Sequence, residues 1–176
     1  MNKLEIAFDN GCEKYNLEDY YFIYNQPDTP PAFSSKKIRF KPTQLPDRLL
    51  LSKIHHNYLI ELKQTKGSRF DFHRIPLHQI RSLLDFERKA GTSYILFSFN
   101  EFEKIVLVHI THFLKLQRIV KKEAYNGERR GKGKSFNVND LEKIKYKSLK
   151  ATLLRKNYEL ELGFLLPNQM VISSFI

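Results

Sequence analysis

The chain has 176 residues, of which 41% are hydrophobic, and it contains 14 phenylalanines and 9 tyrosines. A chain of this length and composition can bury a substantial core, which excludes a disordered protein and predicts one domain over residues 1–176. Thirty Lys and Arg residues against nineteen acids give a net charge of +11. This excess favours a polyanionic partner, with nucleic acid ahead of an anionic membrane surface.

Cysteine content and hydropathy predict where the protein works. Cys12 is the only cysteine, so an internal disulfide is excluded and a reducing compartment is favoured. Residues 1–11 contain acids and lack the apolar core of a signal peptide, and no apolar run approaches the length of a membrane span. We therefore expect a cytoplasmic protein without a membrane partner.

The N-terminal part predicts a helix, a strand and an arm. Residues 1–17 favour a helix with apolar positions, although the Asn10-Gly11 pair interrupts the pattern. Residues 19–26 are aromatic and β-branched, which predicts a strand that ends at the following prolines. Residues 33–44, between flanking prolines, favour an extended arm or hairpin within a basic segment at about 31–44.

The middle of the chain alternates strands and helices. Apolar runs predict strands at residues 48–53, 57–65, 93–99 and 104–110, and helical periodicity predicts helices at 78–91 and 110–124. The order strand, helix, strand across residues 58–99 allows a βαβ crossover. We expect a mixed α/β domain.

The C-terminal part is less regular. Residues 126–136 form a glycine-rich basic loop without an apolar period. Residues 137–154 favour a further helix, and residues 158–167 a last strand or helix.

Three charged residues in two predicted strands form a candidate metal site. Glu61 and Lys63 share one side of a strand because side chains repeat every two residues. Asp47 stands fourteen positions before Glu61, at the front of another apolar run. Two carboxylates can hold Mg²⁺, the carbonyl of Leu62 can assist them, and an ammonium can orient a water or stabilise negative charge. The alternative is a Glu61–Lys63 pair on an exposed strand face, with Asp47 capping a turn.

These residues resemble a known family of nucleases. Pro46-Asp47 followed by Glu61-Leu62-Lys63 resembles the PD-(D/E)xK nuclease superfamily. More narrowly, residues 60–84 followed by 93–99 resemble the RecU-type Holliday junction resolvases. The matching positions are Glu61, Lys63, Thr65, Phe70, His78, Gln79, Ile80 and Phe99. The resemblance implies a restriction-endonuclease-like core, in which a central mixed β-sheet is flanked by helices.

The resemblance also implies roles for individual residues. Asp47 and Glu61 would hold Mg²⁺, for which Mn²⁺ can substitute, and Lys63 would position the attacking water. Gln79 would bind that water or a phosphate; the alternative is an ordinary glutamine on a helix surface. The family carries an acid on its first helix, for which Glu5 is the candidate and Glu13 the rival.

A stalk that enters the centre of a four-way junction is a further property of this family. Residues 33–43 take the equivalent place but are short for a stalk. The predicted DNA-binding residues are Lys36, Lys37, Arg39, Lys41, Thr65, Lys66 and Arg69. The alternative for the arm is a solvated loop whose two phenylalanines fold back onto the domain.

The resemblance implies a metal-dependent endonuclease that resolves four-way DNA junctions by paired symmetric nicks, acting as a homodimer in recombination and repair. Two alternatives stay open: a PD-(D/E)xK nuclease of restriction or repair type, and a non-catalytic DNA-binding protein on the same fold. The His109-x-x-His112 spacing also occurs in metal sites, but a single cysteine and no second pair disfavour zinc.

Overall fold

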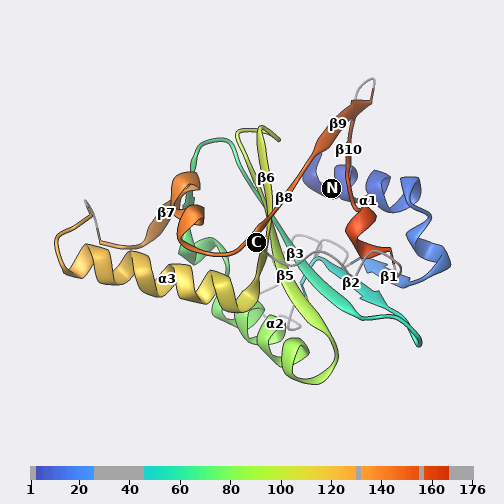
Figure 1. Ribbon diagram of the computed structural model, residues 1–176, viewed down its shortest axis with the longest axis horizontal. Helices are drawn as coiled ribbons and strands as arrows, with labels where there is room; N and C mark the ends of the chain where they lie inside the picture. Colours follow the sequence, from blue (N-terminus) through green and yellow to red (C-terminus); the bar gives the residue numbers. More distant parts are fainter. Residues whose placement is uncertain (1–2, 26–45, 130–131, 155–156, 167–176) are drawn as a thin grey trace, which may run out of the picture.

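The computed structural model describes residues 3–25, 46–129, 132–154 and 157–166, and it centres on a six-stranded sheet (Figure 1). The strands of this sheet lie in the order β1-β2-β3-β5-β6-β8. Their bounds are β1 (Phe22–Asn25), β2 (Arg48–Leu51), β3 (Tyr58–Thr65), β5 (Thr92–Phe99), β6 (Lys104–His109) and β8 (Lys147–Leu149). Two further pairs stand apart from it: β4 (Arg69–Asp71) with β7 (Ser135–Asn137), and β9 (Ala151–Leu154) with β10 (Asn157–Leu160).

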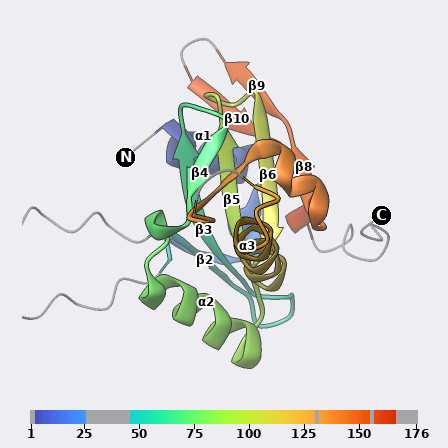
Figure 2. The ribbon, with the colours of Figure 1, turned by 90° about the vertical axis from the view of Figure 1, so that its left-hand side faces the viewer.

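In the described parts of the chain, three α-helices flank the sheet. They are α1 (Lys3–Lys14), α2 (Leu77–Lys89) and α3 (Ile110–Tyr125). Short 3₁₀ turns occupy Leu17–Asp19, Phe72–Arg74, Val138–Lys143 and Gly163–Leu165. Figure 1 shows α1 beside the β9–β10 hairpin, and Figure 2 shows α3 end-on with α2 next to it. The expected mixed α/β architecture is confirmed.

The predicted βαβ crossover is present. β3 pairs in parallel with β5, from Tyr58 opposite Thr92 to Thr65 opposite Phe99, and α2 connects the two strands. The other pairs in the sheet are antiparallel, so the sheet is mixed. Because a parallel pair needs a crossover, the helix that follows Thr65 must return along the sheet to the start of β5.

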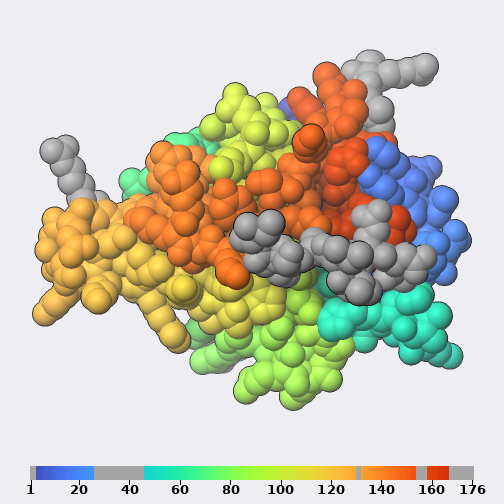
Figure 3. Space-filling view, in the orientation of Figure 1, coloured from blue at the N-terminus to red at the C-terminus, as the bar shows by residue number. Residues whose placement is uncertain are grey.

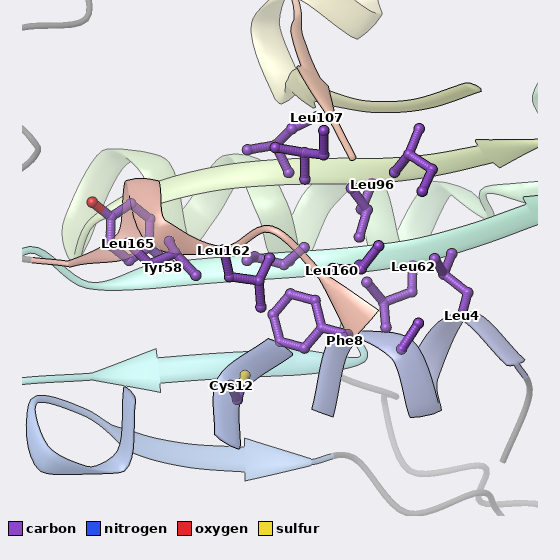
Figure 4. Packing of buried hydrophobic residues seen from close by; sticks show 14 of the residues in the cluster. Leu4, Phe8, Cys12, Tyr58, Leu62, Leu96, Leu107, Leu160, Leu162 and Leu165 are labelled. Atoms are coloured by element: carbon purple, nitrogen blue, oxygen red, sulfur yellow. The ribbon is translucent and has the colours of Figure 1, made fainter. Parts of the chain in front are cut away.

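Each face of the sheet has its own apolar core. Tyr58, Ile60 and Leu62 of β3 pack with α1 and the β10 region, as Figure 4 shows for Leu62 beside Leu4 and Phe8. Leu59 faces the opposite core, which α2, α3 and the β4–β7 pair cover. Strand alternation therefore turns Glu61 and Lys63 to the side of α2 and α3, while Leu62 is buried beneath α1.

The predicted helix over residues 137–154 is wrong. This segment forms the Val138–Lys143 turn and then strands β8 and β9. Asn137 caps the turn by accepting a hydrogen bond from the Asn139 N–H at 3.2 Å. β8 then completes the sheet edge against β6, because tertiary pairing overrides the helix-forming composition of this segment. The last predicted element, strand or helix, is the strand β10.

The expected interruption at Asn10-Gly11 does not occur, since α1 continues to Lys14. A Cβ placed on Gly11 would lie 2.6 Å from the carbonyl oxygen of Leu160. Glycine at this position thus allows β10 to approach the helix backbone closely.

Some expectations fall on other parts of the chain. The predicted arm at about 31–44, with Lys36, Lys37, Arg39 and Lys41, lies outside the described residues. Among the described residues, no helix is long and apolar enough to cross a membrane.

Candidate active site

The strand register brings the two predicted metal ligands together. β2 runs antiparallel to β3 with Arg48 opposite Ile60, so Asp47, just before β2, lies beside Glu61 and Leu62. The backbone N–H of Leu62 donates a hydrogen bond to Asp47 Oδ2 at 2.7 Å. One oxygen of Asp47 is thereby fixed against β3, and the carboxylate lies at the point where the β2–β3 pairing ends.

Glu61 is a buried acid with one unsatisfied oxygen. No part of Glu61 is exposed to solvent. Lys63 Nζ donates to Glu61 Oε1, whereas the buried Oε2 has no hydrogen-bond partner among the described residues. Burial, with the nearby carboxylate of Asp47, raises the pKa of Glu61 to about 7, although Lys63 opposes this shift. A proton, a hydrogen-bond donor or a cation beside Oε2 would each stabilise this acid.

Backbone geometry offers a third oxygen. In a strand, the N–H and C=O of one residue point toward the same neighbour. Because the Leu62 N–H points to Asp47, its carbonyl also points to the β2 side. Carboxylate and carbonyl oxygens are the ligands that hard divalent cations prefer.

Gln79 lies level with Glu61 on the facing helix. Ser93, which is opposite Leu59 in the sheet, donates its hydroxyl to the carbonyl of Leu83 at 2.7 Å. Gln79 is one turn earlier on α2, which is about 6 Å along the helix, and two residues along a strand cover about the same distance. Gln79 and Leu83 are the buried residues of α2, so both face the sheet.

The burial of Gln79 corrects the alternative of an ordinary surface glutamine. Gln79 is only 8% exposed, and its Oε1 has no hydrogen-bond partner among the described residues. An unsatisfied buried amide oxygen costs folding free energy, typically about 1–3 kcal/mol. Together with Glu61 Oε2, it gives this part of the structure two buried oxygens that lack a partner.

A partly buried ion pair, which the sequence did not indicate, supports the position of Asp47. Arg48 is 2% exposed, and its Nε and Nη2 each donate to the carboxylate of Asp9 at 3.0 Å. Arg48 Nη1 also donates to the backbone carbonyl of Asp47 at 3.0 Å. α1 therefore holds the start of β2 through a guanidinium, across a separation of 39 residues that no local pattern reveals.

The two candidate helix acids lie at opposite ends of α1. Figure 4 shows Leu4 beside Leu62 and Cys12 toward Tyr58, so the N-terminal end of the helix is the end near the site. Glu5 is in the first turn and half-buried, one turn before Asp9, whereas Glu13 is exposed near the last turn. The arrangement favours Glu5 over Glu13.

The predicted DNA-binding residues that the structure describes follow Lys63. The hydroxyl of Thr65 donates to the carbonyl of Arg69 at 3.2 Å, which fixes the turn between β3 and β4. Lys66 and Arg69 are exposed. A further cation was not predicted: Arg74 donates to the Gln64 carbonyl at 2.7 Å, and its guanidinium lies 4.8 Å from the centre of the Phe70 ring.

Within the histidine pair, His109 has hydrogen-bond partners in the described structure, whereas the buried Nδ1 of His112 has none there. His109 Nε2 contacts Glu87 Oε1 at 2.9 Å, and its Nδ1 accepts from the Thr111 N–H at the start of α3. Within residues 3–25, 46–129, 132–154 and 157–166, no three His, Cys, Asp or Glu side chains gather as a metal cluster. Two carboxylates remain a sufficient protein contribution for Mg²⁺, which usually keeps waters and substrate phosphates as further ligands.

A mixed sheet with a βαβ crossover, bearing two adjoining carboxylates and a lysine, defines a nuclease-like α/β core. The family model for RecU, described as recombination protein U, matches residues 55–162, which is more than half of the chain. The chain belongs to the RecU family of Holliday junction resolvases, and it is an endonuclease of that family. Glu61, Lys63, Thr65 and Gln79 lie inside the matched range, while Asp47 and Glu5 precede it.

The chain was also compared with solved structures and with curated proteins. A solved structure of Hjc, a Holliday junction resolvase from Archaeoglobus fulgidus, is similar to this chain, with 12% sequence identity and a TM-score of 0.45. The alignment covers 80% of this chain and 91% of that one. No curated protein matches the sequence.

Proposed function

We propose that this resolvase cuts four-way DNA junctions by paired symmetric nicks in a reaction that depends on Mg²⁺, for which Mn²⁺ can substitute. The observation that carries the proposal is the convergence of Asp47, Glu61 and Lys63 at the end of the β2–β3 pairing. Two carboxylates and one ammonium group lie together there. Phosphodiester hydrolysis with a metal ion needs this combination of groups.

Asp47 and Glu61 would hold the ion, with the carbonyl of Leu62 as a third ligand. Asp47 keeps Oδ2 on the Leu62 N–H and has Oδ1 for the ion, and Glu61 has its unpartnered Oε2. A bound Mg²⁺ would polarise the scissile phosphate and lower the pKa of a water. The raised pKa of Glu61 means that ion binding competes with a proton on this carboxylate near neutral pH.

Three further residues would act around the ion. Lys63 is the ammonium nearest to the carboxylate of Glu61, and it would orient the water or stabilise charge that develops on the phosphate. Gln79, whose Oε1 has no partner among the described residues, would accept a hydrogen bond from that water. Glu5, at the near end of α1, would contribute the helix acid.

Paired nicks require two active sites, which a homodimer with two-fold symmetry supplies. The net charge of +11 favours a DNA partner, and the basic residues Lys36, Lys37, Arg39 and Lys41 would contact its backbone together with Thr65, Lys66 and Arg69. The reaction would act in recombination and repair of DNA, and it would take place in the cytoplasm.

The test compares cleavage of a labelled four-way junction with cleavage of a linear duplex of the same sequence, in Mg²⁺ and in EDTA. We expect Mg²⁺-dependent, symmetric nicks in the junction alone. Asp47→Asn and Lys63→Met should abolish cleavage while junction binding in EDTA persists. Equal cutting of the duplex would instead establish a nuclease of restriction or repair type, and binding without any cleavage would establish a non-catalytic DNA-binding protein.

A further inference from the structure

A basic pocket lies beyond the C-terminal end of β3, the strand that carries Glu61 and Lys63. It has a volume of about 390 Å³, and Arg69, Arg129, Lys132, Lys134, Ser135 and Asn137 line it. These residues come from β4, from β7 and from the glycine-rich loop between α3 and β7. Figure 3 shows the end of α3 and the segment after it forming one end of the molecule.

The frame of this pocket is held by specific contacts. β4 pairs with β7 so that Arg69 is opposite Asn137 and Asp71 opposite Ser135. Arg129 donates to both carboxylate oxygens of Asp140, at 2.8 and 2.7 Å, and Asp140 also accepts from the Asn137 N–H. Burial alone would raise the pKa of Asp140, but these charged hydrogen bonds outweigh it and lower that pKa. These hydrogen bonds fix the side of the pocket that contains Arg129 and Asn137. Because Arg129 is paired with Asp140, its positive charge is largely neutralised within the protein.

The lysines supply the charge that remains available. Lys132 and Lys134 are exposed and alternate with the buried residues Gly133 and Ser135. Gly133 has a φ of 63°, and a Cβ on it would lie 3.0 Å from Cα of Lys121, so the loop is packed closely onto α3. Neither lysine makes an ion pair within the part of the chain that the structure describes. Arg69 has only a weak, exposed contact with Asp71 at 3.7 Å.

The pocket is connected to the site by the strand that carries Glu61 and Lys63. Thr65 is two residues beyond Lys63, about 7 Å along β3, and its hydroxyl donates to the carbonyl of Arg69. The β4–β7 pair covers the same face of the sheet to which Glu61 and Lys63 point. A DNA strand presents a phosphate about every 3.4 Å of helix axis, so a strand bound at the site can continue into the pocket.

We propose that Arg69, Lys132 and Lys134 bind backbone phosphates of the junction arm that leaves the active site along β3. The proposal rests on the proposed function, because that function defines which DNA strand lies on β3. The pocket fixes the direction of one arm relative to the scissile phosphate, and it does so without reading base sequence.

The test is a salt titration of junction binding by the full chain in EDTA, so that no cleavage is required. Lys132→Gln/Lys134→Gln should weaken binding uniformly across junction sequences and reduce the slope of log K against log salt concentration by about 2. Adding Arg69→Gln should reduce the slope by about 1 more. Thermal unfolding of each variant should match that of the wild type.

The matched control is Lys53→Gln/Lys89→Gln, which removes the same charge from exposed positions outside the pocket. We expect its slope to equal that of the wild type. An unchanged slope in the pocket variant, or an equal loss in the control, would overturn the proposal. Because the readout is binding in EDTA, failure of Mg²⁺-dependent cleavage contradicts only the proposed function.

Discussion

At the scale of single residues, the site is built from groups that are unfavourable for folding. Glu61 is fully buried, and both its Oε2 and the Oε1 of Gln79 lack partners among the described residues. Unsatisfied buried oxygens are uncommon in folded proteins, and a bound ligand, ion or water is a common reason for them. The free energy lost at these atoms supports the proposal that Glu61 and Gln79 act in the site.

Glu61→Gln should remove a pH-dependent loss of stability. The pKa of Glu61 is raised from 4.5 to about 7 in the folded chain, chiefly by burial. Its contribution to stability is therefore fully present below pH 4.5 and is lost as the pH rises through about 7, because the unfolded carboxyl ionises first. Between about pH 5 and pH 8, without metal, the variant should gain about 3 kcal/mol relative to the wild type.

This prediction is measured by urea unfolding of both proteins across that pH range. With Mg²⁺ present, the wild type alone should recover stability at the alkaline end of the range, since the variant side chain is neutral and lacks the charge that binds the ion. A difference in free energy of unfolding that stays constant with pH would contradict the assignment.

Gln79→Met should separate stability from catalysis. Methionine keeps the length of the side chain and removes the unpartnered oxygen, so the thermal midpoint should hold or rise. Cleavage of the junction should fall about 100-fold, as expected when a hydrogen bond to the reacting groups is lost. Thermal unfolding and single-turnover cleavage measure the two effects, and full activity in this variant would exclude Gln79 from the site.

At the scale of elements, α1 and β2 are joined through the Asp9–Arg48 pair. This pair could not be predicted, because its members are 39 residues apart and each resembles an ordinary surface charge in the sequence. The Asp47, Glu61 and Lys63 set could be predicted, because strand periodicity and the apolar runs around it fix which residues share a face. Local spacing thus indicated the functional groups, while their support came from tertiary packing.

Asp9→Ala should loosen the start of β2. The variant leaves the guanidinium of Arg48 buried without its carboxylate, which should cost less than the roughly 3–5 kcal/mol of a fully buried pair because Asp9 is 28% exposed. Because Arg48 also holds the Asp47 carbonyl, the Mg²⁺ concentration for half-maximal cleavage should rise. Unfolding and Mg²⁺ titration measure these effects.

The control for this variant is Asp85→Ala. Asp85 pairs with Arg88 on an exposed face, where the two side chains are 52% and 71% exposed, and such a pair contributes little. Asp9→Ala/Arg48→Met should recover part of the lost stability without restoring Mg²⁺ affinity. An unchanged Mg²⁺ requirement in Asp9→Ala would limit the pair to a structural role.

Gly11→Ala tests the close contact between α1 and β10. Alanine favours a helix by about 1 kcal/mol over glycine, but its Cβ would lie 2.6 Å from the Leu160 carbonyl oxygen. We expect a net loss of about 1–3 kcal/mol, the usual cost of overpacking. Gly67→Ala is the control, since nothing lies within 4 Å of its Cβ, and unfolding by denaturant compares them. Stabilisation by Gly11→Ala would contradict the packing.

At the scale of the whole molecule, one sheet separates two cores and carries the site at its β2–β3 end. The βαβ unit and most strands followed from apolar patterns, because burial on a sheet or under a helix gives each its own period. The C-terminal strands did not follow, because residues 137–154 contain good helix formers. The strand β8 forms there because Lys147–Leu149 pairs with β6, which lies far away in the sequence.

In the proposed site, Asp47 and Glu61 share one divalent cation. Anomalous diffraction from a crystal of the protein soaked in Mn²⁺ tests it most directly. We expect one strong peak between the two carboxylates, with an oxygen of each about 2.0–2.3 Å away, and its disappearance in Asp47→Asn. A peak elsewhere, or no peak at millimolar Mn²⁺ with both side chains ordered, would contradict it.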